Sequence, residues 1–406
     1  MTFAELWKEL LPVGRDEVTG GYRRYSWTEE DAACRGWFAR TATDLGLRTD
    51  CDRNGNLWAW WGQPGPGCEP AIATGSHLDS VPDGGAFDGP LGIVSAFAAV
   101  SQLRANGFRP ARPIGIAAFT EEEGARFGVA CLGSRLMTGA IDPGAARELR
   151  DGEGVSLADA MLAAGRDPAL LGEDDELLAE LGCYVELHVE QGSALDGLGA
   201  AIGVAEGIWP HGRWRFDFTG RPDHAGTTRL ADRRDPMLPF AAAVQAARTA
   251  AAAHGALATF GKVTAEPGAA NAISAAVHAW LDARAPDETV LQQLVGQIQA
   301  AAAEAAAAHG VTLGLRQESF TPVVAFSPAL RDRAVGVLAA AGIGAPALPT
   351  GAGHDAGILA ARIPTGMLFV RNPSGVSHSP AEHAELADCE TGVTALAALL
   401  ADLAGR

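Results

Sequence analysis

Two hydrophobic periodicities organise the first half of the chain. Apolar runs typical of buried strands occupy residues 54–61, 71–74, 114–120 and 183–189. Helical spacing of apolar positions occupies residues 28–45 and 91–106, and residues 140–181 form a more polar, helical region. Because predicted strands alternate with predicted helices, we expect an α/β fold with a mostly parallel sheet and helices on both faces.

The pattern changes near residue 208. Beyond it, the predicted order is strand, helix, strand, strand, helix, strand, at residues 213–219, 236–254, 259–264, 275–283, 287–309 and 311–316. This order is typical of a ferredoxin-like α+β domain. A helix, a buried strand and a terminal helix follow at residues 328–341, 364–370 and 390–404. We therefore predict a first domain formed by residues 1–208 and 325–406, with residues 209–324 inserted as a second.

Composition narrows the classes of partner. The chain has 406 residues, a length that favours two domains, and its formal net charge of −18 disfavours nucleic acid and anionic membranes as partners. No apolar run approaches the roughly 20 residues that span a bilayer. Six cysteines occur without a CxxC pair, which favours reduced thiols and a cytoplasmic location. A small molecule is therefore the expected partner.

The stretch TGSHLDSVPDGGAFDGPLG follows the predicted strand at residues 71–74. It carries His77, Asp79 and Asp88 on loops at the carboxyl end of that strand, where α/β sheets place their sites. Imidazole and carboxylate groups suit zinc, manganese, cobalt or nickel, and one carboxylate can bridge two ions. Alone, the stretch is also compatible with a loop histidine beside two solvated aspartates.

Three further stretches supply the same residue types after predicted strands. Glu122 and Glu123 follow the strand at residues 114–120, His188 lies in ELHVEQG, and His378 lies in SGVSHSP. The run EEEG by itself is compatible with a solvated acidic loop. Taken together with the first stretch, these residues predict two metal ions that share one carboxylate.

Six stretches resemble the amidase, hydantoinase and carbamoylase family of dinuclear metallohydrolases: GSHLDSVPDGGAFDGPLG, EEEGARFG, ELHVEQG, DHAGTT, GAGHDA and SHSPAEH. They occur in the family's order between residues 74 and 383. The resemblance implies a zinc-exopeptidase-like catalytic domain, with residues 209–324 as a lid and dimerisation domain of a homodimer.

For the metal ions, the resemblance implies two sets of ligands. His77 and His188 would hold one ion, Glu123 and His378 the other, and Asp88 would bridge them.

For catalysis, the resemblance implies that Asp79 orients His77 and fixes its tautomer. Glu122 is the expected general base, because it lies beside a ligand without being needed as one.

For substrate binding, the resemblance implies that Arg284 binds a carboxylate, which suits its planar guanidinium group. Gln191 and Asn271 resemble amide contacts to the same substrate, and His224 resembles a histidine that stabilises an oxyanion. His354, in GAGHDA, either positions the substrate or packs near the metals as a loop residue.

The predicted function is a cytoplasmic amidohydrolase that cleaves the ureido C–N bond of an N-carbamoyl-L-amino acid. Allantoate amidohydrolase is the nearest alternative, because allantoate also has a carboxylate beside a ureido group. An N-acyl amino-acid amidase, an aminopeptidase and a catalytically silent dimeric binding protein are further alternatives. Arg229 and Leu230 follow HAGTT where relatives often carry proline and methionine, and FVRNPSG precedes SHSP, so substrate preference stays open.

Overall fold

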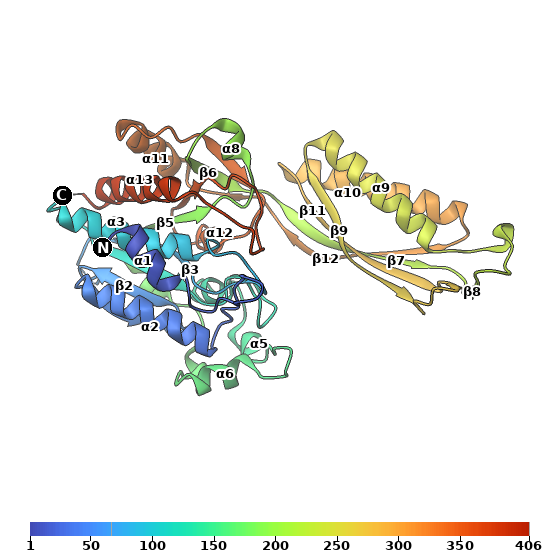
Figure 1. The fold of residues 1–406 in the computed structure, drawn as a ribbon, viewed down its shortest axis with the longest axis horizontal. Helices are drawn as coiled ribbons and strands as arrows, with labels where there is room; N and C mark the ends of the chain where they lie inside the picture. Colours follow the sequence, from blue (N-terminus) through green and yellow to red (C-terminus); the bar gives the residue numbers. More distant parts are fainter. Residues whose placement is uncertain (66, 406) are drawn as a thin grey trace. The chain divides into compact units, whose positions relative to one another are not determined.

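A computed structural model of the protein describes residues 1–65 and 67–405. The chain divides into two compact units (Figure 1). The first unit contains Met1–Gly207 and Ala325–Arg406, and the second contains Ile208–Val324. The boundaries expected at residues 209 and 324 lie within one residue of this division.

The first unit is built on a nine-stranded sheet with the order β1-β2-β4-β3-β5-β15-β6-β13, and β14 pairs with β6. The strands are β1 (Arg48–Cys51), β2 (Leu57–Trp61), β3 (Ala71–His77), β4 (Ile114–Phe119), β5 (Leu181–Val189), β6 (Ile202–Ile208), β13 (Val324–Ala325), β14 (Ala347–Thr350) and β15 (Thr365–Val370). The neighbours β4, β3, β5 and β15 run parallel, whereas β1, β2 and β6 pair antiparallel. Every residue of β3, β4 and β15 is buried, as expected for central strands covered on both faces.

Helices cover this sheet. They are α1 (Phe3–Leu10), α2 (Glu29–Asp44), α3 (Pro90–Ala105), α4 (Leu132–Met137), α5 (Pro143–Arg147), α6 (Leu157–Ala163), α7 (Asp175–Glu180), α8 (Ala194–Leu198), α11 (Pro328–Ala340), α12 (Asp355–Leu359) and α13 (Leu386–Ala404). The long helices α3 and α13 pack against each other and against the central strands, and their apolar side chains join the main core (Figure 1). Within residues 1–65 and 67–405, every helix is too short or too polar to cross a bilayer.

The second unit has a four-stranded antiparallel sheet with the order β12-β7-β11-β9. Its elements are β7 (His211–Thr219), β8 (Asp223–His224), α9 (Met237–His254), β9 (Leu257–Glu266), β10 (Ala272–Ile273), β11 (Ala276–Arg284), α10 (Glu288–Ala308) and β12 (Thr312–Thr321). Buried residues of α9 and α10 pack on one face of the sheet and form a separate core. The order of long elements is the predicted ferredoxin-like order.

The mixed α/β fold is confirmed, with one refinement. The predicted mostly parallel sheet describes only the centre, because antiparallel strands extend both sides. The pattern missed β1, β6, β13 and β14, although β6 is seven residues long and buried at six of them. β1 and β14 are four residues long, and three residues of β1 are exposed, so neither strand shows an apolar run that periodicity could detect.

Candidate metal centre

The central parallel strands deliver the predicted ligands to one edge of the sheet. His77 is the last residue of β3, and His188 is the penultimate residue of β5. Glu122 and Glu123 follow the end of β4, which lies beside β3. Because the carboxyl ends of parallel strands share one edge, segments distant in the sequence meet there.

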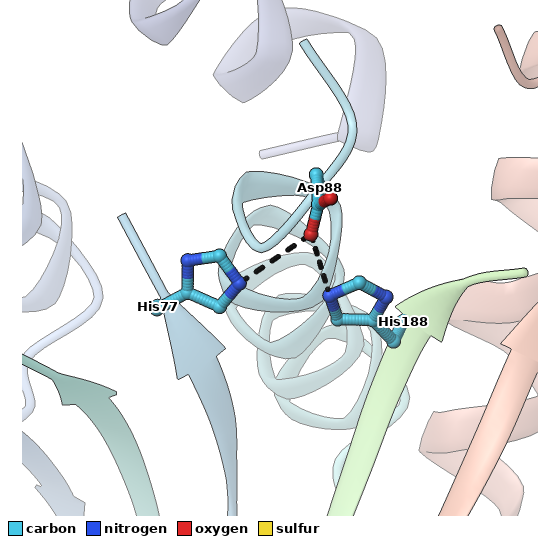
Figure 2. Close-up of side chains that lie close together, drawn as sticks. All are labelled: His77, Asp88 and His188. Carbon is cyan, nitrogen blue, oxygen red and sulfur yellow. Dashed lines mark ion pairs between the residues drawn. The ribbon is translucent and has the colours of Figure 1, made fainter. Parts of the chain in front are cut away.

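Asp88 lies at the centre of this group, in the loop before α3. Its Oδ1 atom is 3.6 Å from Nε2 of His77 and 3.1 Å from Nε2 of His188 (Figure 2). Its Oδ2 atom is 3.3 Å from Nε2 of His378, and that nitrogen is 3.6 Å from Oε2 of Glu123. Each oxygen of Asp88 therefore faces a different set of donors, which is the geometry of a bridging carboxylate.

The donor atoms fit two divalent cations. Those of His77, Asp88 and His188 lie within 4.8 Å of one another, and so do those of Asp88, Glu123 and His378. Among the described residues, buried Nε2 of His77, Nε2 of His188 and Oε1 of Glu123 make no hydrogen bond. Buried polar atoms rarely lack a partner, so these atoms are suited to a cation.

Backbone carbonyl groups fix the tautomers of two histidines. Nδ1 of His77 donates to the carbonyl of Asp79 at 3.1 Å, and Nδ1 of His188 donates to the carbonyl of Val189 at 2.8 Å. A neutral ring that donates from Nδ1 keeps the lone pair on Nε2. The Nε2 lone pairs of both rings are therefore available to a metal ion.

Close packing of charges shifts several pKa values. Burial opposes ionisation of Asp88, but the imidazoles of His188, His378 and His77 hold its pKa well below the usual range. Contact with Asp88 raises the pKa of His378 to about 9, and burial raises that of Glu123 to about 7. The carboxylates repel one another and the imidazoles compensate only in part.

Two carboxylates hold the loops of the centre through backbone amides. Asp79 accepts from the amide of Glu122 at 3.2 Å and from that of Glu123 at 3.0 Å. Its carboxylate is farther from His77, at 3.5 Å from Nδ1. Asp79 thus orients His77 mainly through its carbonyl group, while its carboxylate positions the two glutamates.

Glu382 performs the equivalent task for Asp88, and the sequence pattern did not single it out. Its Oε1 atom accepts from the amides of Phe87 and Asp88, both at 2.9 Å, and Ser377 donates to its Oε2 atom at 3.1 Å. Glu382 lies within SHSPAEH, four residues after His378. Only its presence in that motif could have indicated a role.

Backbone strain concentrates at the centre. Glu121 and His378 have φ values of 57° and 55°, in the left-handed region that residues other than glycine rarely adopt. Gly89 has a φ of 86°, and a Cβ atom there would meet the His77 ring at 2.4 Å. A glycine is therefore required beside the bridging carboxylate.

Glu122 lies beside the proposed metal ligands, but it belongs to neither of the two ligand sets that share Asp88. Its buried carboxylate places Oε2 at 3.7 Å from Nε2 of His77. Burial raises the pKa of Glu122 well above its ordinary value, with a further contribution from Asp355 and Glu123 that His77 opposes. A carboxylate with a raised pKa is suited to accepting and returning a proton.

Gln191 and His354 also lie at the centre. Nε2 of Gln191 donates to Oδ2 of Asp88 at 2.7 Å and lies 3.3 Å from Nε2 of His378. The buried His354 ring packs edge-on against His188, with centroids 4.5 Å apart. Burial and the neighbouring His188 lower the pKa of His354 well below its ordinary value, so the ring is neutral.

His224, Asn271 and Arg284 belong to the second unit, where the structure separates them. β8 pairs with β10 so that His224 opposes Ala272, and the amide of Ala225 donates to the carbonyl of Asn271 at 3.0 Å. Arg284 ends β11 at the opposite extremity from Ala276, about 26 Å away for a strand of this length. His224 and Asn271 are therefore neighbours, whereas Arg284 is remote from both.

The sequence pattern of peptidase family M20/M25/M40 matches residues 73–402, and the chain belongs to this family. The family is metal-dependent, which agrees with the donor sets around Asp88. The chain is accordingly a hydrolase that acts on C–N bonds, and the resemblance inferred from its motifs is confirmed.

Individual relatives align over nearly the whole chain. An N-carbamoyl-L-amino acid amidohydrolase of Geobacillus stearothermophilus is 36% identical over 395 residues, which cover 96% of each chain. An allantoate amidohydrolase of Escherichia coli is 32% identical, covering 99% of this chain and 98% of the relative. The crystal structure of an amidase of the hydantoinase/carbamoylase family from Burkholderia multivorans superposes with a TM-score of 0.90 at 29% identity, covering 100% of this chain and 98% of that one.

Binding of divalent metal should release protons near neutral pH. At pH 7, His378 with a pKa of about 9 is protonated and Glu123 with a pKa of about 7 is half-protonated, whereas both must be deprotonated to bind a cation. Affinity should therefore rise with pH between pH 7 and pH 9. Calorimetric titration of chelator-treated protein with Zn²⁺ or Mn²⁺, in buffers of different ionisation enthalpy, measures the protons released.

His378→Ala should release fewer protons and bind one ion fewer. His383→Ala is the matched control, because His383 lies beside Glu385 rather than in the donor sets. Affinity that is independent of pH in the unmodified protein would contradict the assignment of His378.

Proposed function

We propose that the protein is a metal-dependent amidohydrolase that cleaves the ureido C–N bond of an N-carbamoyl-L-amino acid. The observation that carries this proposal is the position of the Asp88 carboxylate between two groups of histidines. Its Oδ1 atom faces His77 and His188, whereas its Oδ2 atom faces His378. The similarity to the N-carbamoyl-L-amino acid amidohydrolase of Geobacillus stearothermophilus supports the choice of substrate.

The proposed reaction transfers one water molecule across the ureido group. When bound, two divalent cations, of zinc, manganese, cobalt or nickel, polarise the ureido carbonyl and lower the pKa of water. Glu122 accepts a proton from the attacking water, whose oxygen bonds to the ureido carbon. Glu122 then returns the proton to the amino-acid nitrogen as the C–N bond breaks. The carbamic acid released decomposes to carbon dioxide and ammonia.

In this proposal Arg284 binds the substrate carboxylate. Its Nε atom lies 2.9 Å from Oδ1 of Asp282, two residues earlier on the same face of β11. Its Nη2 atom also lies 3.4 Å from Oδ2 of Asp282, so this ion pair orients the guanidinium group that we propose for the substrate carboxylate. Gln191 and His354, at the metal centre, are the proposed contacts to the ureido end of the substrate.

His224 is the proposed donor to the oxyanion, together with Asn271 as an amide contact. The amide of Gly226 donates to Nδ1 of His224 at 3.0 Å, so the neutral ring carries its proton on Nε2. An exposed Nε2–H group on β8 is available to donate to developing negative charge.

We propose a homodimer because one copy of the second unit cannot bring all three residues to one substrate. Arg284 lies about 26 Å from Ala276 at the other end of β11, and β10, which pairs with the strand that carries His224, precedes Ala276 in the chain. A small carboxylate-bearing substrate is far shorter. Two copies joined through residues 209–324, each supplying His224 and Asn271 to the other, would complete both sites.

The six cysteines are free thiols, which supports the proposed cytoplasmic location.

Allantoate is the second candidate substrate, supported by the relative from Escherichia coli. Arg284 and the metal centre suit it equally, because allantoate has a carboxylate beside a ureido group. An aminopeptidase would instead offer acidic groups to a free ammonium. A catalytically silent binding protein is disfavoured because Glu122 and all proposed ligands are present at the centre.

A substrate panel tests the proposal. Metal-reconstituted protein should release equal amounts of ammonia and amino acid from N-carbamoyl-L-amino acids, and should leave the D-enantiomers intact. Allantoate, ureidopropionate, N-formyl and N-acetyl amino acids complete the panel, with both products assayed. Hydrolysis of allantoate alone would select the second candidate, and cleavage of N-acyl substrates without ureido activity would replace the proposal.

Glu122→Gln should abolish turnover while both metal ions remain bound. An amide cannot accept the proton, so kcat should fall at least about 100-fold, the usual contribution of a general base. Metal content by elemental analysis and kcat on the preferred substrate check this. Glu153→Gln, at an exposed loop position, is the control. Near-full activity of Glu122→Gln would remove Glu122 as the base.

Arg284→Ala should raise KM for carboxylate-bearing substrates roughly 10- to 100-fold, because the substitution removes hydrogen bonds to a charged group and the binding free energy that they supply. Arg316→Ala is a matched control on the same sheet, because Arg316 also pairs with an acidic residue two positions away, Glu318 at 2.7 Å. Steady-state kinetics of both variants measure the difference. An equal KM in the two variants would end the assignment of Arg284.

A further inference from the structure

Cys131 touches the proposed base directly. Its Sγ atom lies 3.3 Å from Oε1 of Glu122 and donates a hydrogen bond to it. The other oxygen of Glu122, Oε2, faces His77 and the metal centre. The two carboxylate oxygens therefore have different environments, one hydrogen-bonded to a thiol and one directed at the reacting groups.

The backbone holds Cys131 in this place. The amides of Cys131, Leu132 and Gly133 donate to the carbonyls of Glu122, Glu121 and Thr120 at 2.6, 3.0 and 2.9 Å. These amides stand at the start of α4 and would otherwise lack partners within the helix. The register of this pairing sets residue 131 opposite residue 122.

Cys131 also adopts a strained conformation. Its φ of 54° lies in the left-handed region, which costs a side chain other than glycine energy that the surrounding contacts must supply. Cys131 as a whole residue is 3% exposed. Burial, together with the charges of Glu122 and Asp355, raises the pKa of Cys131 well above its ordinary value, so the thiol keeps its proton and remains a donor.

We propose that Cys131 is a positioning residue for Glu122: its thiol holds Oε1 and thereby leaves Oε2 as the oxygen that exchanges the proton. A thiol is a weak donor, so it orients the carboxylate without neutralising its basicity. This role rests on the proposed function of Glu122 as the general base. The contact between the Cys131 thiol and the Glu122 carboxylate is independent of that function.

Kinetics of three variants test the role. Cys131→Ala removes the donor and should lower kcat about five- to tenfold, the effect of one modest hydrogen bond, with KM and metal content unchanged. Cys131→Ser restores a donor at the same strained position and should recover most of kcat. Cys183→Ala, which removes a buried thiol from β5, should leave kcat unchanged. Equal kcat in the two Cys131 variants, or an equal loss in Cys183→Ala, would overturn the proposal.

Infrared spectroscopy tests the contact independently of activity. Subtracting the spectrum of either Cys131 variant from that of the unmodified protein isolates the S–H stretching band of Cys131. That band should move to higher frequency in Glu122→Ala, where the acceptor is missing, while the band of Cys183 should not move. An S–H stretching frequency of Cys131 that is unchanged by Glu122→Ala would overturn the proposal. If the unmodified protein hydrolyses no member of the substrate panel, the proposed function fails, and the infrared result still decides the contact.

Discussion

The structure depends on burying one carboxylate, Asp88, among three imidazoles and two further acids. Removing charges from water is costly unless they are paired, and Asp88, His77, His188 and Glu122 are buried, whereas Glu123 is half-buried and His378 is exposed. Three imidazole nitrogens face the two oxygens of Asp88, and two of them, Nε2 of His77 and Nε2 of His188, make no hydrogen bond within the described residues. Two divalent cations would satisfy these atoms and offset the repulsion among the carboxylates. Metal affinity and the integrity of the loops should consequently be linked.

The loops that carry these ligands are held by backbone hydrogen bonds rather than by hydrophobic packing alone. Asp79 binds the amides of the two glutamates after β4, and Glu382 binds the amides around Asp88. Each carboxylate thus connects a ligand-bearing loop to a different part of the chain. Because both acceptors are buried carboxyl groups and each accepts two backbone hydrogen bonds, they limit the movement of the ligands. Such restraint is what a centre with two closely spaced cations requires.

In the second unit, the residues proposed to contact the substrate lie on two different sheets. Arg284 stands at one end of β11, and the β8–β10 pair with His224 stands beyond the other. The rigid length of an antiparallel sheet keeps these groups apart, so recognition of the carboxylate and stabilisation of the oxyanion become tasks for different copies of the chain in the proposed dimer. Assembly would then be a condition for activity rather than a source of added stability.

The residue types and the apolar runs along the chain were enough to predict which side chains form the candidate metal centre. Residues at the ends of apolar runs, His77, Glu122 and His188, could be placed at one edge of a sheet because strand periodicity reports burial and parallel strands share their carboxyl ends. The tertiary structure decided the rest: which oxygen of Asp88 faces which donors, that Glu382 supports Asp88, and that Cys131 meets Glu122. These contacts depend on loop conformation and on pairing between distant segments, and local hydrophobic patterns carry no information about either. The same limit explains the missed edge strands, whose short and exposed residues have no buried face to produce a pattern.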